Sequence, residues 1–226
     1  DSSTSRGLGD VYKRQFQHMV EEFFLVQSRY SAAIKEIQTK LEILDDEFQM
    51  RHRRNPIHHM QSRLKTIQSM LEKLKRKNYE VSINSAVKNL QDIAGIRVIC
   101  SYVQDVYTIA NLLVSQDDVH LVRMADYIRE PKPNGYRSLH LIVEIPVFLS
   151  RGRILVPDEV QIRTIAMDFW ASLEHSLRYK AQEYIPQHIS DELQRVATDI
   201  ASLDQRMQAI HDQVDELSDA RSDNAT

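Results

Sequence analysis

Two acidic residues far apart in the chain, Asp92 and Glu159, each lie in a short polar segment beside strand-like apolar residues. Residues 91–97 read QDIAGIR, so a carboxylate precedes two small residues and an arginine. Residues 158–163 read DEVQIR, and the period of two in a strand places Glu159 on one face with the glutamine and the arginine. If the two strands are neighbours, both carboxylates can converge on Mg²⁺, which proteins hold with one or two carboxylates plus substrate phosphates. A structural Asp–Arg pair is the alternative interpretation of the first segment.

Residues 51–77 form a basic run, with nine Lys or Arg residues and one acidic residue. Within it Lys65, Ser69 and Lys73 follow at intervals of four, which places them on one face of a helix expected over residues 61–77. A hydroxyl between two ammonium groups suits a polyphosphate, because it combines charge neutralisation with a hydrogen-bond donor. A solvated helix face or a nucleic-acid-binding surface would explain the same charges.

Residues 132–140, KPNGYRSLH, combine a turn with aromatic and basic side chains. Pro, Asn and Gly favour a turn that presents Tyr136 and His140. A tyrosine beside cations can stack on a nucleobase, an interaction of about 1–3 kcal/mol per base. Tyr136 as a core residue and His140 as a structural histidine are the alternatives. The chain has no glycine-rich phosphate loop, so cationic and aromatic side chains would have to hold a nucleotide.

The composition limits the class of protein. The 226 residues are 42% hydrophobic, which is enough for a sizeable core, and carry a formal net charge of −3. A single cysteine excludes a disulfide framework and a zinc site built from cysteines. No apolar run approaches the roughly 18 residues of a membrane span, so we expect a soluble, cytoplasmic protein.

Helices and strands must bring the polar segments together. Apolar residues recur at steps of three and four over residues 30–48, which indicates an amphipathic helix, and Asn55-Pro56 would end it. The pattern predicts an α+β domain, with a mixed sheet of about five strands flanked by helices and with long N- and C-terminal helices. Strands are expected at residues 96–100, 119–128, 138–148 and 154–163, and helices at residues 105–114 and 164–179.

The two ends of the chain differ from this body. Residues 5–15, SRGLGDVYKRQ, resemble the translation of a sequencing-library adapter, so we expect residues 1–15 to be an adapter-derived or disordered tail. Residues 187–226 are acidic and carry an apolar seam with alternating steps of three and four, with His211 expected on the solvent face. This seam can pack back on the N-terminal helices or pair with another subunit.

Three segments in this order, DIAGIRV, DYIREPKPNGYRSLHL and EVQIRTIAMDFWASLEHSLRYK, resemble the synthetase domain of the RelA/SpoT alarmone family, in the form of a stand-alone small alarmone synthetase. The resemblance covers roughly residues 30–180. It implies a nucleotidyltransferase-like fold and a synthesis-only enzyme that moves pyrophosphate from ATP to the 3′-hydroxyl of GDP or GTP, giving ppGpp or pppGpp and AMP. The expected organisation is a tail (1–15), N-terminal helices (16–50), the synthetase domain (51–180) and a C-terminal amphipathic helix for packing or oligomerisation (181–226).

The resemblance also implies roles for individual residues on the ATP side. Arg63 and Arg97 match the arginines that sandwich adenine. Asp92 and Glu159 match the Mg²⁺ ligands and catalytic carboxylates, and Glu159 is also placed to assist deprotonation of the 3′-hydroxyl. Three further positions match residues that line the ATP phosphates: Lys65, Ser69 and Lys73.

On the side of GDP or GTP, Tyr136 matches the tyrosine that stacks on guanine, with Asn134 beside the base. Lys132 and His140 match residues near the phosphates of this nucleotide. One departure is Ala125, which stands where the family often has a lysine or arginine. The phosphate contact at that position is therefore not expected from Ala125 itself.

The resemblance further implies a homotetramer, with single-stranded RNA as a candidate effector. Residues 55–65, NPIHHMQSRLK, resemble the subgroup of small synthetases that the alarmone product does not activate. Two alternatives stay open. One is an enzyme of the same fold that uses an adenosine nucleotide as acceptor. The other is a helical assembly module or single-stranded RNA binder that uses the basic run of residues 51–77.

Overall fold

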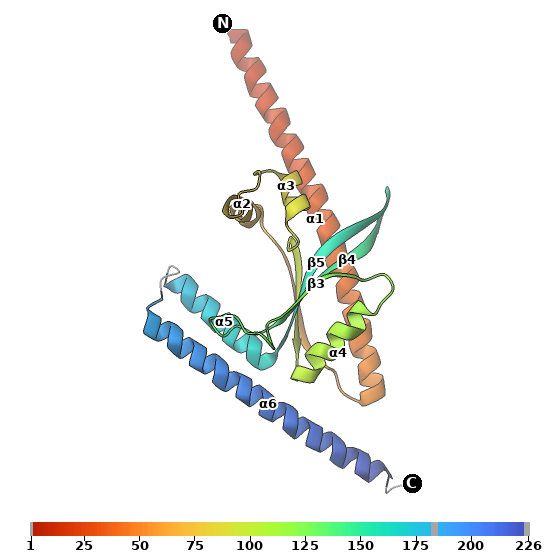
Figure 1. Ribbon diagram of the computed structural model, residues 1–226. Coiled ribbons are helices and arrows are strands. Elements are labelled where there is room, and N and C mark those ends of the chain that lie inside the picture. Colours follow the sequence, from red (N-terminus) through yellow and green to blue (C-terminus); the bar gives the residue numbers. More distant parts are fainter. Residues whose placement is uncertain (1, 182–184, 224–226) are drawn as a thin grey trace.

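The computed structural model describes the backbone of residues 2–181 and 185–223 and the side chains of residues 21–181 and 185–217. In chain order the described residues form α1 (Ser2–His52), β1 (Ile57–Leu64), α2 (Ile67–Arg76), α3 (Ile83–Asn89), β2 (Ala94–Cys100), α4 (Val103–Val114), β3 (His120–Asp126), β4 (Leu139–Leu149), β5 (Gly152–Thr164), α5 (Ile165–Lys180) and α6 (Gln187–Asp223). Figure 1 shows these elements as one sheet with helices on both sides. The α+β architecture expected from the sequence is confirmed.

The five strands pair in the order β1-β2-β5-β4-β3. β2 and β5 are parallel, whereas the other neighbouring pairs are antiparallel. The β4–β5 hairpin turns between Leu149 and Gly152, in the gap between the strands expected at residues 138–148 and 154–163. The parallel pairing sets Gly95 opposite Glu159, so the two polar segments of the sequence lie on adjacent central strands.

The two faces of the sheet are covered differently. α1 and α4 pack on one face, and their buried apolar residues join those of the strands in the main core. The seam predicted for α1 is confirmed, since Tyr30, Ile37 and Leu41 are among its fully or nearly fully buried residues. α5 follows β5 and leans over the opposite face, with α6 packed against it (Figure 1). The open space between this face and α5 is where the functional residues gather.

The helix expected over residues 61–77 is wrong in its first part. Residues 61–64 belong to β1, which pairs with β2 alone at the sheet edge. An edge strand can keep polar side chains, so β1 lacks the apolar alternation that signals a strand. Thr66 then caps α2 by accepting a hydrogen bond from the Ser69 backbone N–H, which starts the helix at Ile67. The short helix α3 has no counterpart among the helices expected from the sequence.

The N-terminal region differs from expectation in a second way. A single helix, α1, runs through Ser2–His52, where a tail over residues 1–15 and several N-terminal helices were expected. No proline interrupts this stretch before Pro56, so the backbone hydrogen-bonding pattern of a helix can continue through it. The adapter origin of residues 1–15 stays a prediction.

α6 packs against α5 and α4 rather than along the N-terminal helix. His211 does not face solvent as expected, because its ring stacks on Tyr102 with the ring centroids 4.1 Å apart. The apolar seam of α6 is nevertheless largely exposed; its exposed members include Val196, Leu203 and Ile210. No helix of the described residues is long and apolar enough to cross a membrane.

Candidate active site

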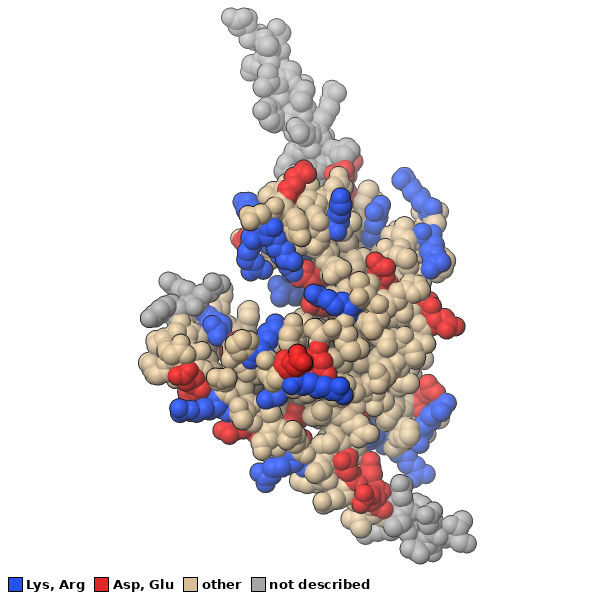
Figure 2. Space-filling model, in the orientation of Figure 1, with Lys and Arg blue, Asp and Glu red and all other residues tan. Residues whose placement is uncertain are grey.

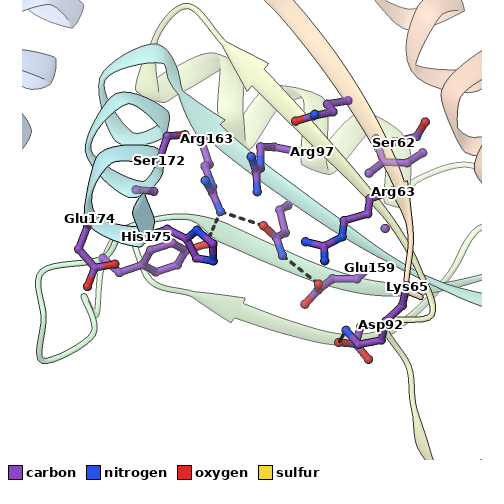
Figure 3. Close-up of a pocket in the computed structure, with 16 residues that line it drawn as sticks. Ser62, Arg63, Lys65, Asp92, Arg97, Glu159, Arg163, Ser172, Glu174 and His175 are labelled. Atoms are coloured by element: carbon purple, nitrogen blue, oxygen red, sulfur yellow. Dashed lines mark hydrogen bonds and ion pairs between the residues drawn. The ribbon is translucent and has the colours of Figure 1, made fainter. Parts of the chain in front are cut away.

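A cavity of about 680 Å³ lies between the open face of the sheet and α5. Basic side chains border the hollow seen between the sheet and α5 in Figure 2. Figure 3 shows the lining side chains, which come from β1, β2, β5 and α5, from the loop after β1 and from the loops before β2 and β4. Predicted site residues that line it are Arg63, Lys65, Asp92, Arg97, Tyr136 and Glu159. Lining residues that the sequence reasoning did not select are Gln61, Ser62, Gly95, Ile96, Gln161, Arg163, Ala171, Ser172, Glu174 and His175.

Asp92 lies at one end of the cavity, just before β2, and two lysines share one of its oxygens. The Nζ atoms of Lys65 and Lys73 lie 2.8 and 2.5 Å from Asp92 Oδ2. Burial raises the pKa of Asp92, but the hydrogen bonds and charges of the two lysines outweigh burial and bring the pKa below its ordinary value of 3.8. Asp92 Oδ1 is buried and has no hydrogen-bond partner. Asp92 is thus an ionised carboxylate with one oxygen available to a cation.

Glu159 lies on β5 and is held by two neighbours on the same face of the sheet. Gln161 Nε2 donates to Glu159 Oε2 at 2.9 Å, and His140 Nδ1 lies 3.4 Å from Glu159 Oε1. Burial raises the pKa of Glu159, whereas the contacts with His140 and Gln161 lower it, and the net pKa lies below its ordinary value of 4.5. The negative charge of Asp92 raises the pKa of Glu159 and is the smallest of these influences.

The residues present fit a hard divalent cation in part. Asp92 and Glu159 line the same cavity as carboxylates with lowered pKa values, and Asp92 Oδ1 lacks a partner. Among the described residues no three His, Cys, Asp or Glu side chains gather into a complete metal site. This combination suits Mg²⁺, which takes one or two protein carboxylates and completes its shell with water and substrate phosphates.

Arg63 and Arg97 enter the cavity from neighbouring strands, two residues out of register (Figure 3). Arg97 Nη1 lies 3.7 Å from Asp168 Oδ1 at the start of α5. Burial and the charge of Arg163 lower the pKa of Arg97, and Asp168 partly offsets them. Both arginines therefore line the same cavity, and their contact with a planar base stays a prediction.

Tyr136 lies on the loop before β4, and two cationic groups lie close to its ring. Lys132 Nζ lies 4.8 Å from the ring centroid and the Arg163 guanidinium carbon lies 5.1 Å from it. Asn134 supports the loop from both ends of its amide, since Oδ1 accepts from the Tyr136 N–H and Nδ2 donates to Glu174 at 3.1 Å. Tyr136 is a half-buried residue of the site rather than a member of the main core.

Gly135 fixes the shape of this loop. Its φ of +89° is a conformation that residues with a Cβ rarely adopt, and a Cβ there would lie 2.6 Å from the Cβ of Ala197 on α6. The loop that carries Tyr136 is therefore seated directly on the C-terminal helix.

The remaining predicted residues occupy different places. Lys73, Lys132, Asn134 and His140 do not line the cavity, but each contacts a residue that does. Ser69 contacts Thr66 at the start of α2 and none of the lining residues through a described hydrogen bond. The expected helix face of three residues is not formed, because Lys65 precedes the helix.

Comparison with known proteins gives a consistent picture. The family described as the region found in RelA / SpoT proteins matches residues 62–184. The GTP pyrophosphokinase YwaC of Bacillus subtilis (strain 168) is 45% identical over 186 residues, which cover 82% of this chain and 89% of YwaC.

Two solved structures from Bacillus subtilis are also similar. Small alarmone synthetase 2 has a TM-score of 0.74 and 43% identity, covering 81% of this chain and 96% of that one. Small alarmone synthetase 1 bound to its product pppGpp has a TM-score of 0.75 and 37% identity, covering 82% and 94%. Because the family matches residues 62–184 and a 45% identical relative matches 82% of the chain, the chain belongs to the RelA/SpoT family.

Proposed function

We propose that this chain is a GTP pyrophosphokinase that transfers the pyrophosphate group of ATP to the ribose 3′-hydroxyl of GDP or GTP. The products are AMP and the alarmone ppGpp or pppGpp. The observation that carries the proposal is a single cavity lined by two arginines, a tyrosine and two carboxylates: Arg63, Arg97, Tyr136, Asp92 and Glu159. Such a cavity can hold two nucleotides with their reacting groups side by side.

The bonds that change define what the cavity must do. The 3′-oxygen attacks the β-phosphorus of ATP, a P–O bond forms, and the bond between the β-phosphorus and the oxygen bridging to the α-phosphorus breaks. AMP leaves with that oxygen, and the proton of the 3′-hydroxyl goes to a base. Positioning of the two nucleotides and stabilisation of phosphate charge contribute most to catalysis of such transfers.

The ATP is assigned to the side of β1 and β2. Arg63 and Arg97 line the part of the cavity that is assigned to adenine, because the interaction of a guanidinium group with an aromatic face is favourable. Lys65 and Lys73 lie beyond it and serve the phosphates. These lysines neutralise Asp92 when no phosphate is present, so the arriving phosphates compete with Asp92 for the two ammonium groups.

The acceptor nucleotide is assigned to the side of the Tyr136 loop. The half-buried Tyr136 ring provides a stacking surface for guanine, and Asn134 lies beside it. Lys132 Nζ stands over the rings of both Tyr127 and Tyr136, where it can meet a phosphate at the rim of the cavity. Guanine stacked on Tyr136 leaves the ribose facing β5, which carries Glu159.

Glu159 is assigned two roles, as a ligand of the cation and as the base that accepts the 3′-proton, and its pKa affects both. A lowered pKa favours the charged carboxylate that a cation ligand needs. The same shift makes Glu159 a weaker base, so it takes the 3′-proton only as the new P–O bond removes electron density from the attacking oxygen. Mg²⁺ held by Asp92 and Glu159 would supply charge neutralisation on the phosphate oxygens.

The proposed assembly is a homotetramer in the cytoplasm, where ATP and guanosine nucleotides are both supplied. Two helices support the assembly, because each exposes a row of large apolar residues. On α5 these are Ile165, Phe169, Leu173 and Leu177, and on α6 they are Ile189, Val196, Leu203, Ile210 and Leu217. A mass by light scattering near four times the 26.4 kDa chain is expected, and a stable monomer would contradict the proposal.

Single-stranded RNA stays a proposed effector rather than the main ligand. Four basic residues of the run at residues 51–77 are paired with carboxylates: Arg51 with Glu47, Arg54 with Asp105, and both Lys65 and Lys73 with Asp92. Apart from Arg63 in the cavity, the exposed basic residues of the run fall into two small groups, Arg51 with Arg53 around the end of α1, and Lys75, Arg76 and Lys77 at the end of α2 and just beyond it. A binder of RNA alone would not need the buried carboxylates.

The activity is tested with ATP labelled at the β-phosphate, Mg²⁺ and one acceptor at a time. Label in guanosine tetraphosphate with GDP, or in the pentaphosphate with GTP, together with unlabelled AMP, is the expected result. Label in an adenosine product when ADP or AMP is supplied, with none on GDP or GTP, would favour the adenosine alternative. Absence of any labelled nucleotide, with RNA binding that Tyr136→Ala leaves unchanged, would favour the RNA-binding alternative.

A further inference from the structure

Five side chains on the open face of the sheet form a closed ring of contacts: Arg163, Tyr136, His140, Glu159 and Gln161. Arg163 Nη2 donates to the Tyr136 hydroxyl at 2.7 Å and to Gln161 Oε1 at 2.9 Å. One arm of the ring then runs through Gln161 to Glu159 at 2.9 Å. The other arm runs through the Tyr136–His140 contact at 2.8 Å and the His140–Glu159 contact at 3.4 Å. Figure 3 shows Arg163 and Glu159 at the two ends of the first arm.

The donors and acceptors around the ring are mutually consistent. Because Arg163 donates to the Tyr136 oxygen, the hydroxyl proton is free to donate to His140 Nε2. This assigns the imidazole proton to Nδ1, which faces Glu159 Oε1. Every bond of the ring therefore has one donor and one acceptor, and both arms end on the Glu159 carboxylate.

Arg163 is the residue of the ring that is held most firmly in place. Its side chain is 5% exposed, and Asp168 Oδ1 accepts from its Nη1 at 3.1 Å. Both arms start from the two hydrogens of the same nitrogen, Nη2, while Nη1 is held by Asp168. The guanidinium group is planar and its N–H directions are rigid, so the angle between the arms is set by the chemistry of this one side chain.

We propose that Arg163 is a positioning residue that aligns the Tyr136 platform with the Glu159 carboxylate, and that Asp168 holds it in place. The inference rests on the proposed function. A base stacked on Tyr136 determines where the ribose 3′-hydroxyl lies, and Glu159 must meet that hydroxyl. Because Arg163 is bonded to Tyr136 directly and to Glu159 through Gln161, it fixes the distance between the two.

The expected size of the effect follows from the geometry that the reaction needs. A misplacement of about 1 Å in a reacting pair can lower the rate about 100-fold. Lysine keeps the charge of Arg163 but lacks the planar fork, so it cannot hold Asp168 and both arms at the same angles. We expect Arg163→Lys to lower kcat by about 10- to 100-fold, with a smaller change in the KM for ATP.

The experiment is a double-mutant cycle of Arg163→Lys and Tyr136→Phe, with kcat and both KM values measured for each form. Phenylalanine keeps the ring for stacking and removes only the hydroxyl that receives the Arg163 bond. If the two residues act through that bond, the double variant is no slower than the slower single variant. Effects on kcat that multiply would overturn the proposal.

Arg54→Lys is the matched control, because Arg54 also makes a fork to a buried carboxylate. Its Nη1 and Nη2 donate to the two oxygens of Asp105 at 3.0 and 2.8 Å, outside the cavity. Arg54→Lys is expected to lower the melting temperature and leave kcat of the folded protein unchanged. If Arg163→Lys behaves in the same way, with wild-type kcat, Arg163 has only a structural role and the proposal is overturned.

The failure of this inference and that of the proposed function are distinguishable. If the unmodified chain labels no guanosine nucleotide, the proposed function fails, and the alignment of Tyr136 with Glu159 fails with it. If the unmodified chain forms the product and Arg163→Lys forms it at the same rate, only the inference about Arg163 fails.

Discussion

Asp158 and Glu159 are neighbours on β5, yet they lie on opposite faces of the sheet and their pKa values shift in opposite directions. Glu159 faces the cavity and contacts His140 and Gln161, and its pKa is lowered. Asp158 faces α1, is fully buried, and neither of its oxygens has a hydrogen-bond partner. Burial, followed by the charge of Glu159, raises the pKa of Asp158 well above 3.8, and the nearby backbone N–H of Glu159 only partly offsets this rise.

The comparison shows that a carboxylate is kept charged by its partners, not by its position in the sequence. On the open face each acidic residue of the site has cationic or amide neighbours. On the closed face, which is the face covered by α1 and α4, Asp158 is surrounded by apolar core residues of α1 and the strands, together with the buried Tyr30. Burial raises the pKa of Tyr30 to about 12, so its hydroxyl stays neutral there as well. The open face thus carries charged carboxylates, whereas Asp158 on the other face is shifted toward its neutral form.

Removal of the charge on the open face should have the largest effect. Glu159→Gln is nearly isosteric and removes both the cation ligand and the base, so we expect a loss of about 10²–10⁴-fold in alarmone synthesis. The melting temperature should change little. The measurement is product formation from labelled ATP and GDP.

Glu144→Gln is the matched control for this change. Glu144 lies on β4, where it pairs with Pro157 of β5, on the same face as Glu159 but outside the cavity. The Glu144→Gln variant should keep wild-type activity. Equal losses in the two variants would mean that the open face as a whole, and not the carboxylate in the cavity, determines the rate.

Substitution of Asp92, the second carboxylate of the open face, should change the dependence of activity on Mg²⁺. Loss of an outer partner of a metal ligand costs about 10–100-fold in metal affinity, so loss of the ligand itself in Asp92→Asn should cost at least as much. The Mg²⁺ concentration for half-maximal activity should rise accordingly. Asp118→Asn, which removes a different lysine-bound carboxylate, should leave the Mg²⁺ titration unchanged. An unchanged titration in Asp92→Asn would remove Asp92 from the proposed cation site.

A substitution on the closed face should change the stability of the protein rather than its activity. Asp158→Val replaces a buried, unpartnered carboxyl group with an apolar side chain of strand-forming type. We expect the free energy of unfolding to rise by about 1–3 kcal/mol, the cost of one unsatisfied buried polar group. Denaturant unfolding measures it, and activity should be retained. A destabilised Asp158→Val would show that the carboxyl group has a partner of structural value.

The smallest expected effect is the pH dependence of the stability gained in Asp158→Val. Because the pKa of Asp158 is raised in the folded state, the unfolded chain releases this proton first as the pH rises above 3.8. The contribution of Asp158 is therefore most favourable below that pH and is lost as the pH rises through the folded pKa. The stability difference between Asp158→Val and the unmodified chain should thus be larger at pH 8 than at about pH 5. A difference that shrinks with rising pH would contradict the raised pKa.

Much of the site could be predicted because its segments have local patterns. The period of two in residues 158–163 correctly placed Glu159 and Gln161 on one face and Val160 on the other. The seam of α1 and the strand at residues 96–100 were also recognised from their apolar periodicity. The resemblance to a known family supplied the roles that periodicity cannot supply.

Errors occurred where the signal was weak or nonlocal. Residues 61–64 of β1 were predicted to be helical because an edge strand with polar residues lacks alternation, and its backbone groups pair only with β2. His211 was expected in solvent because nothing in its helix indicates Tyr102, its stacking partner. Glu174 and His175 were not selected, since their place in the cavity depends on how α5 leans over the sheet.

The amino-acid order alone determined which side chains share a face, since the repeat of a strand or helix is fixed by its own backbone. It also determined that a carboxylate pair, a cationic segment and a tyrosine turn were available. The tertiary structure alone decided that Arg163 meets Tyr136 across 27 positions of sequence, and that Asp158 has no partner. Those outcomes depend on strand order and helix packing, because the directions of hydrogen bonds and the exclusion of water arise only when distant segments are brought together.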